Sequence, residues 1–358
     1  MTLRLISILL LPLLLLTTRP EIAASQMRNP SGELLLSQPD DILPQTMQES
    51  EFNEFWNYQI YLDNGVKLHI IFSVNNFGSF RAPVSGVRVT AFGLTEETYN
   101  LTREYDLDWL VLDEENYTFR NRNERDLYFT GKLPEEHRVV IHTTKSGIEY
   151  DIDLQFSDIH PGYKWGDATY HLNDDFVGIV THIPYANVTG RVVIDGNGGA
   201  VTGTGYMDQT WQTRSVTRLV HSGYRMVHHG GPDNWDILYF LLRSDRDERY
   251  TVGHRLSRSG GETRINGVTQ ITEKTKSRAF GKQLAQNLSI QLNDGRTMSI
   301  NRSRDDETYS LLSELPWVAR RAARSFLGGE VVDFRGEVYC RIEGELPKTG
   351  EYNYFIID

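Results

Sequence analysis

The sequence predicts an all-β protein made of two β-barrel or β-sandwich domains, with one short helix near the C-terminus. Hydrophobic and polar residues alternate along many short segments, as they do in strands with one buried face. Glycine-containing turns separate these segments at fairly regular spacing. The length of 358 residues exceeds the needs of one small core and suits two domains.

The first 25 residues predict a cleavable secretory signal peptide. Arg4 is a short basic region, an aliphatic run extends from Leu5 to Leu16, and Ala23 and Ser25 stand at the −3 and −1 positions of a cut before Gln26. The alternative is a membrane anchor, but the run is shorter than the ~20 apolar residues that cross a bilayer. We therefore expect a mature chain that begins at Gln26 and is secreted or remains in the secretory pathway.

Sequons of the form N-x-Ser/Thr agree with this route and predict a glycoprotein. A chain with this many asparagines contains some sequons by chance, so they support secretion only together with the signal peptide. They stand at Asn100, Asn116, Asn187, Asn287 and Asn301.

Composition excludes several kinds of protein. The single cysteine, Cys340, rules out an internal disulfide and a zinc site built from several thiolates, and its alternating segment predicts a buried, unreactive thiol. The net charge of −11 offers no positive field to nucleic acid. No later stretch is long and apolar enough to span a membrane. We expect neither a nucleic-acid partner nor a membrane span, and the oligomeric state is left open.

The strands follow a polar segment, residues 26–52, which we expect to be an extended lead-in. Residues 148–156 alternate strictly, and residues 237–242 form a continuous apolar run typical of a strand covered on both faces. Asn-Gly and other glycine turns predict hairpins because they supply positive φ angles. These hairpins join 58–62 to 66–72, 192–194 to 201 onward, and 288–292 to 296–300.

The domain boundary is expected in a loop region between Asp158 and Asn187, which is rich in Gly, Pro, Asp and Tyr. This gives an N-terminal β-domain over residues 53–175 and a C-terminal β-domain over residues 176–358.

One segment predicts a helix. Ser313 is expected to cap it, and Gly328 and Gly329 to end it. Its two faces differ in character, which predicts a buried apolar face and a solvated basic face. The apolar residues are Val318, Ala322 and Phe326, and the basic residues are Arg320, Arg321 and Arg324.

Residues that could carry chemistry are concentrated between Gly203 and Tyr239, although the common hydrolase, nucleotide and metalloprotease motifs are absent from the sequence. On the expected strand GTGYMDQTW, Tyr206 and Asp208 share one face and Gln209 lies on the other. A buried aspartate beside aromatic rings has a raised pKa and can exchange a proton near neutrality. A polar network that merely satisfies buried groups explains the same residues.

Histidines in this region do not predict a metal site. His228 and His229 are neighbours and would point to opposite faces of a strand, so they and His221 could not ligate one ion without a loop.

The segment IPYANVTGRVVIDG…VTGTGYMDQTW resembles the lipocalin-like family of bacterial carotenoid hydratases (hydroxyneurosporene synthases), fungal kievitone-hydratase-like proteins and fungal Diels–Alderases. That family's pattern ends in G-x-G-Y-x-D-H-x-W-G. The segment LPWVARRAARSFLGG is also similar to the family's C-terminal end. The resemblance extends over roughly residues 50 to 358 and implies two lipocalin-like β-domains with a pocket between them. Gln209 replaces the usual His and Gln212 the usual Gly, which removes an obvious general acid.

The resemblance implies a secreted fungal enzyme of secondary metabolism, and most closely a hetero-Diels–Alderase of tropolone–sesquiterpenoid pathways. Such an enzyme joins a tropolone-type quinone methide to a terpene, needs no cofactor or metal, and takes apolar polyketide or terpenoid substrates. Asp208, Gln209 or Arg214 would hydrogen-bond the heterodiene oxygen. The expected substrate-binding residues are Tyr206, Trp211, His221, Trp235 and Tyr239.

Two alternatives stay open. A kievitone-type hydratase would use Asp208 to protonate a prenyl alkene, which water then captures. A non-enzymatic, lipocalin-like carrier would bind an apolar small molecule without changing it.

Overall fold

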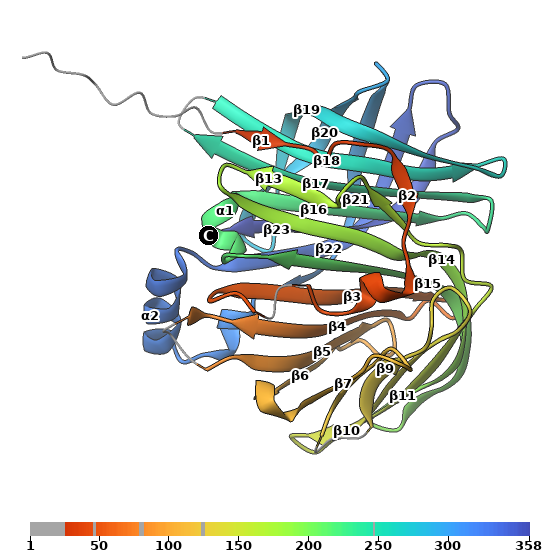
Figure 1. Ribbon diagram of the computed structural model, residues 1–358, viewed down its shortest axis with the longest axis vertical. Helices are drawn as coiled ribbons and strands as arrows, with labels where there is room; N and C mark the ends of the chain where they lie inside the picture. Colours follow the sequence, from red (N-terminus) through yellow and green to blue (C-terminus); the bar gives the residue numbers. More distant parts are fainter. Residues whose placement is uncertain (1–25, 46–47, 79–81, 123–125, 246–247) are drawn as a thin grey trace, which may run out of the picture.

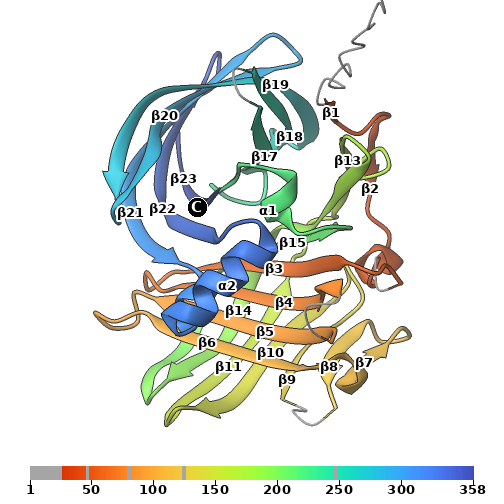
Figure 2. The same ribbon diagram turned by 90° about the vertical axis from the view of Figure 1, so that its left-hand side faces the viewer.

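The computed structural model describes residues 26–45, 48–78, 82–122, 126–245 and 248–358. The predicted signal peptide lies outside the described residues. Strands form two large sheets, one above the other in Figure 1. The lower sheet is curved and the upper one closes into a barrel, whose open end is visible in Figure 2. The prediction of an all-β fold with two barrel-like sheets is confirmed.

The first sheet is antiparallel throughout its main path. Neighbouring strands in this path run in the order β6 (Tyr99–Asp106), β5 (Val84–Phe92), β4 (Lys67–Asn76), β3 (Phe52–Leu62), β15 (Asn197–Gln212), β14 (Asp175–Ile194), β11 (Ile148–Ser157), β10 (His137–Lys145), β9 (Leu127–Thr130), β8 (Thr118–Asn121) and β7 (Leu110–Asp113). Its concave face holds an aromatic core in which the rings of Trp56, Phe72, Phe119 and Phe129 pack against one another.

The second sheet is a closed antiparallel barrel. Its strands follow chain order: β16 (Ser222–His229), β17 (Asn234–Asp245), β18 (Glu248–Ser259), β19 (Glu262–Ala279), β20 (Lys282–Leu292), β21 (Thr297–Tyr309), β22 (Val331–Ile342) and β23 (Lys348–Ile357). Pairing of β23 with β16 closes it. Cys340 is buried in its core, and burial raises the pKa of the thiol to about 12, as expected for an unreactive cysteine.

The predicted hairpins are confirmed. Gly65 and Gly295 occupy the left-handed region, with φ of 87° and 86°, in the turns of β3–β4 and β20–β21. The alternating segment 148–156 forms β11, in which Tyr150 and the alternate residues after it are buried. The apolar run 237–242 lies within β17 and is buried throughout.

The prediction of a loop region between residues 158 and 187 is wrong. It contains β12 (Tyr163–Trp165), β13 (Thr169–Leu172) and the first half of β14. Because β14 and β15 hydrogen-bond to β11 and β3, both belong to the first sheet. The two sheets therefore divide between Gln212 and Ser222, and not after residue 175 as predicted.

The lead-in is extended, and it is also bound to the fold. β1 (Met27–Arg28) pairs with β13, and β2 (Leu34–Leu36) pairs with β12. Asn29 reaches the second sheet, where it accepts a hydrogen bond from Gly253 N–H (2.7 Å) and donates one to the Val268 carbonyl (3.1 Å). The 3₁₀ turn η1 (Pro39–Ile42) then returns the chain to the first sheet, and Figure 1 shows this path across both sheets.

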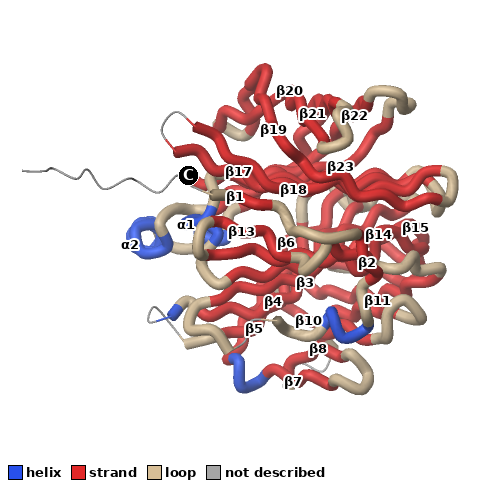
Figure 3. Tube along the Cα trace, turned by 45° about the horizontal axis from the view of Figure 1, so that its top comes forward, coloured by secondary structure: helices blue, strands red, loops and turns tan. Residues whose placement is uncertain are grey.

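The described residues include two short α-helices, α1 (Val216–Leu219) and α2 (Trp317–Leu327), which lie at the same end of the molecule (Figure 3). The described residues also include two short 3₁₀ turns, η3 (Leu107–Trp109) and η4 (Leu311–Glu314). In the part of the chain that the structure describes, no helix is long and apolar enough to cross a membrane.

The predicted orientation of helix α2 is wrong, because its apolar face is exposed. The helix ends at Gly328 as predicted, but Pro316 is its N-cap and Ser313 lies in η4. Val318 and Phe326 are exposed, whereas Arg320 donates to the buried Glu330 carboxylate at 2.6 and 3.0 Å. Arg320 and Arg324 lie against this carboxylate because a buried carboxylate requires a cation, although both side chains stay partly exposed and Arg321 is exposed on the surface.

Candidate functional site

Polar side chains form matched rows where the two sheets meet. On the first sheet, strand pairing aligns Tyr206 with Gln59 and His69, and aligns Asp208 with Asn57. Residues in register share one face of a sheet. On the barrel, pairing aligns a second row across β16, β23, β22 and β21, which consists of Arg225, Asn353, Arg335 and Glu307.

Asp208 joins these rows. Arg225 pairs with its carboxylate through Nε at 2.6 Å from Oδ2 and Nη2 at 3.0 Å from Oδ1. Tyr206 donates its hydroxyl to Oδ2 at 2.6 Å, and Asn57 donates Nδ2 to Oδ1 at 2.8 Å. The guanidinium of Arg225 lies 5.9 Å from the centre of the Tyr239 ring.

Burial and hydrogen bonding act on Asp208 in opposite directions. Burial raises the pKa of its carboxyl, whereas Arg225, Tyr206 and Asn57 lower it. Burial also lowers the pKa of Arg225, but the Asp208 carboxylate outweighs that effect and raises it. With donors on both oxygens, Asp208 is suited to holding Arg225 and Tyr206 in place, and its own proton transfer would require these bonds to loosen.

Gln209 lies on the opposite face of β15, as the alternation predicts. Its Nε2 donates to Glu54 Oε1 at 2.6 Å and to the Leu43 carbonyl at 3.1 Å, and its Oε1 accepts from His182 Nε2 at 2.8 Å. Burial lowers the pKa of His182 to about 4, so its imidazole is neutral at pH 7. The structure therefore separates Gln209 from Asp208.

The predicted aromatic residues occupy different surroundings. Trp211 packs against Val180 and directly over Gly178, where a Cβ would stand 2.0 Å from the indole. Trp235 is fully buried near Tyr206 and donates Nε1 to His160 at 3.3 Å. Trp235 and Tyr239 lie near the Asp208 network, which consists of Asp208, Arg225, Tyr206 and Asn57. Trp211 lies on the other face of β15, which carries Gln209.

Arg214 and His221 lie apart from Asp208. Arg214 is exposed, with Nη1 3.5 Å from the Asp175 carboxylate. His221 is also exposed, and its backbone groups pair with Leu242 and Ile357 at the edge of the barrel.

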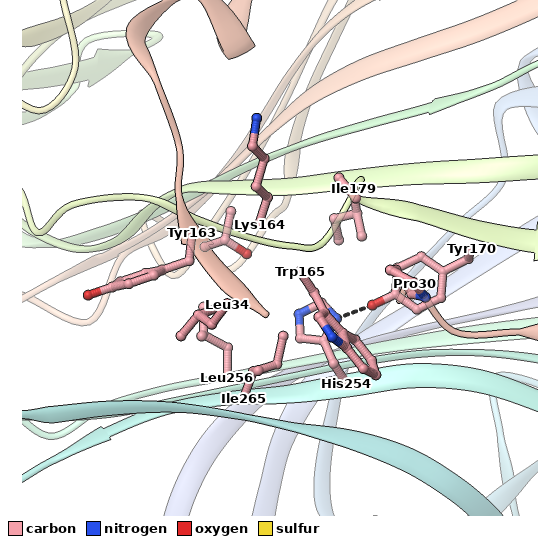
Figure 4. Close-up of a pocket in the computed structure, with 12 residues that line it drawn as sticks. Pro30, Leu34, Tyr163, Lys164, Trp165, Tyr170, Ile179, His254, Leu256 and Ile265 are labelled. Carbon is pink, nitrogen blue, oxygen red and sulfur yellow. Dashed lines mark hydrogen bonds between the residues drawn. The ribbon is translucent and has the colours of Figure 1, made fainter. Parts of the chain in front are cut away.

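A small cavity lies beside this region, under the lead-in (Figure 4). Pro30 and Leu34 cover it, and Tyr170 and His254 hydrogen-bond to each other at its wall. Burial lowers the pKa of His254 to about 4. Its volume of about 10 Å³ holds about one water at most, so a larger ligand has to displace the covering residues.

Sequence reasoning missed Arg225, Asn57, Tyr170 and His254. Arg225 lies within the polar segment between Gly203 and Tyr239, and the need of a buried aspartate for a cation was the signal that could have found it. Among the described residues, no group of three or more His, Cys, Asp or Glu side chains is placed to hold a metal ion.

The asparagines of the sequons are either exposed or half-buried. Asn100, Asn116 and Asn301 are exposed, whereas Asn187 and Asn287 are half-buried. Asn187 donates Nδ2 to Asp158 at 2.8 Å.

Comparisons with known proteins identify the fold. No protein-family model and no curated protein matches the chain. Among solved structures it is similar to a candidate AttH protein of Nitrosomonas europaea, with 14% identity, a TM-score of 0.61, and coverage of 91% of this chain and 97% of that one. It is also similar to CghA in its complex with Sch210972, with 11% identity, a TM-score of 0.59, and coverage of 91% and 98%. Kievitone hydratase from Nectria haematococca matches at 10% identity and a TM-score of 0.48, over 92% and 97%.

Proposed function

We propose that this protein is a cofactor-independent enzyme of fungal secondary metabolism that joins a tropolone-type quinone methide to a terpene by a hetero-Diels–Alder cycloaddition. The observation that carries the proposal is the buried Asp208–Arg225 pair between the sheets, beside Tyr206 and Tyr239. The resemblance of the segment around Tyr206 and Asp208 to lipocalin-like Diels–Alderases and hydratases supports it.

The chemistry required is limited. Two bonds form together in a cycloaddition, so the reaction needs two partners held in a reactive geometry and no covalent intermediate. A hydrogen bond to the heterodiene oxygen withdraws electron density from the diene and lowers the barrier. In the proposed mechanism Arg225 supplies that hydrogen bond, and Asp208 keeps its guanidinium oriented. Tyr239 and Trp235 would provide the apolar walls.

Substrate entry requires movement of the lead-in. Sites for ligands of this size occupy about 300–1,000 Å³, far more than the cavity under Pro30 and Leu34 offers. The lead-in is the cover that could yield most easily, because β1 and β2 are only two and three residues long. We propose that both substrates bind where these residues now pack.

A hydratase of the kievitone type is the second candidate. The observation that favours it is the direction in which burial shifts the pKa of Asp208, since a raised pKa helps a carboxyl to protonate an alkene. Arg225 works against it by stabilising the carboxylate.

The experiment supplies the purified protein with a tropolone quinone-methide precursor and a terpene, and follows the products by mass spectrometry. A cycloadduct that carries the combined mass of both partners, formed faster than the spontaneous reaction and as one stereoisomer, is expected. A gain of one water would indicate the hydratase. Binding without any change in rate would indicate a carrier.

Variants then test the assignment of residues. Arg225→Gln is expected to lower the rate by about tenfold to a thousandfold, the range for removing one donor to a developing charge. Arg138→Gln is the matched control, because Arg138 forms an exposed pair with Asp153 in the first sheet. An unchanged rate in folded Arg225→Gln would remove Arg225 from the mechanism.

A further inference from the structure

Buried polar groups without partners lie in the middle of the junction between the sheets. His69 of β4 and Gln59 of β3 are cross-strand neighbours on the face that carries Tyr206, and they are 6% and 7% exposed. Within the described residues, neither ring nitrogen of His69 nor Nε2 of Gln59 has a hydrogen-bond partner. An unsatisfied buried group costs about 1–3 kcal/mol, so three such atoms in adjacent side chains indicate a ligand or water that satisfies them.

Two arginines near His69 have further donors without partners in the part of the chain that the structure describes. Arg335 belongs to the barrel row and donates Nη1 to Glu307 Oε2 at 2.9 Å, while its Nε has no partner among the described residues. Arg88 of β5 stacks its guanidinium 3.2 Å from the centre of the Tyr309 ring, and its Nη2 is buried and equally without a partner in the described chain.

The charges of these arginines reach His69. Its pKa is lowered well below the usual value, first by burial and then by Arg335, Arg88 and Arg225. The pKa of Arg88 falls to about 10, first because it is buried and then because Arg335 lies near. Three side chains act on the pKa of Arg88 in the opposite direction, namely Tyr309, Asp333 and Glu307. A ligand is therefore indicated by the unpartnered donor atoms and not by an excess of positive charge.

The unpartnered atoms define the complementary ligand. Gln59 Nε2, Arg88 Nη2 and Arg335 Nε can only donate, and a neutral imidazole at His69 adds one donor and one acceptor. A group that meets them must present several acceptor oxygens and few donors. Carboxylates and ionised enols fit this requirement, and arginine binds such oxygens with the strongest of these hydrogen bonds.

We propose that Gln59, His69, Arg88 and Arg335 form a binding site for an anionic oxygen group, a carboxylate or an ionised enol, at the polar end of an otherwise apolar small molecule. The site adjoins the Asp208 network, because Gln59 pairs in register with Tyr206, and Arg335 and Arg225 both pair in register with Asn353 in the barrel. This inference deepens the proposed function and rests on it only in calling the ligand a substrate.

The test is a binding measurement on the mature chain, with tropolone and benzoate as anionic probes and benzamide as a neutral probe of similar shape. Calorimetric titration at pH 8 is expected to show saturable binding of both anions, about tenfold or more tighter than benzamide. Side-chain nitrogen NMR is expected to show the His69 imidazole signals moving as the anions bind. Equal binding of benzamide, or no saturable binding, would mean that only water occupies the cluster.

Two variants locate the site. Arg335→Gln and Arg88→Gln are each expected to weaken anion binding about tenfold, whereas Arg138→Gln on the solvent face should leave it unchanged. Circular dichroism establishes which variants fold, and the NMR shift in the unmodified protein tests the site even if neither does. An equal loss in Arg138→Gln would overturn the assignment.

Failure of this site is distinguishable from failure of the proposed reaction. Cycloadduct formation without anion binding would refute the site and leave the reaction standing. Anion binding without any product from the two substrates would refute the proposed reaction and leave the site standing.

Discussion

Asp208 of β15 and Arg225 of β16 form an ion pair between the two sheets, with 2.6 Å between Oδ2 and Nε. The Asp208 side chain is fully buried and Arg225 is 8% exposed. The strands that carry them flank the segment where the chain passes from the first sheet to the barrel. The pair therefore fixes the orientation of the barrel close to its covalent attachment.

Asp208→Asn is expected to destabilise the protein strongly. The substitution leaves the buried Arg225 without a counter-ion, which typically costs about 3–5 kcal/mol. Urea unfolding measures the change in the free energy of unfolding. The matched control is Asp153→Asn, which breaks an exposed pair with Arg138 and should cost less than about 1 kcal/mol. Similar losses in both variants would show that the buried pair has no special role.

Gly178→Ala is expected to displace Trp211. The added Cβ would stand 2.0 Å from the indole, so the ring or the strand must shift, at a cost of about 1–3 kcal/mol or more. Tryptophan fluorescence and urea unfolding should both change. Gly199→Ala in β15 is the control, because none of the described residues comes within 4 Å of its Cβ. Unchanged fluorescence in Gly178→Ala would contradict the packing.

Stability is expected to fall below pH 6.5, in part because of His182. Its pKa is about 4 in the folded protein, since burial disfavours the charged ring, and about 6.5 in an unfolded chain. Between these values the unfolded state holds a proton that the folded state lacks, so stability is lost as pH falls from 6.5 towards 4. The slope approaches about 1.4 kcal/mol per pH unit for this group.

His182→Gln tests that contribution. Glutamine keeps a donor for Gln209 Oε1 but does not titrate. We expect the unfolding free energies of the two proteins, measured between pH 7 and 4, to differ by an amount that grows as pH falls, at a rate approaching about 1.4 kcal/mol per pH unit. Parallel curves would show that His182 does not contribute.

Gln209→Leu is expected to lower stability and to leave turnover nearly unchanged. The side chain bonds to Glu54 and His182 on the face away from Asp208, so its loss leaves buried polar groups with fewer partners, at about 1–3 kcal/mol. Rates at saturating substrate and urea unfolding separate the two effects. A large loss of rate in a stably folded variant would support a catalytic Gln209.

The strands could be predicted from sequence because their patterns are local. Alternation located β11, and glycine turns located the β3–β4 and β20–β21 hairpins. The same rule placed Asp208 and Gln209 on opposite faces. The helix α2 broke the expectation that apolar faces turn inward, because the buried Glu330 is supplied by a different segment.

The polar junction could not be predicted in the same way. Gln59 and His69 alternate with apolar residues as solvent-facing residues of a strand do, and sequence gives no sign that a second sheet covers them. Their burial depends on the barrel, which is built from residues far along the chain, such as Arg335, whose charge acts on His69. Local periodicity carries no information about those contacts.

The path of the lead-in has a consequence for synthesis. Asn29 bonds to Gly253 and Val268, which are 224 and 239 residues further along the chain. A ribosome makes the N-terminus first, so Asn29 cannot form these two bonds until β18 and the first half of β19 have been made. The contacts of Asn29 in the cover over Tyr170 and His254 therefore form only after every strand of the first sheet has been made.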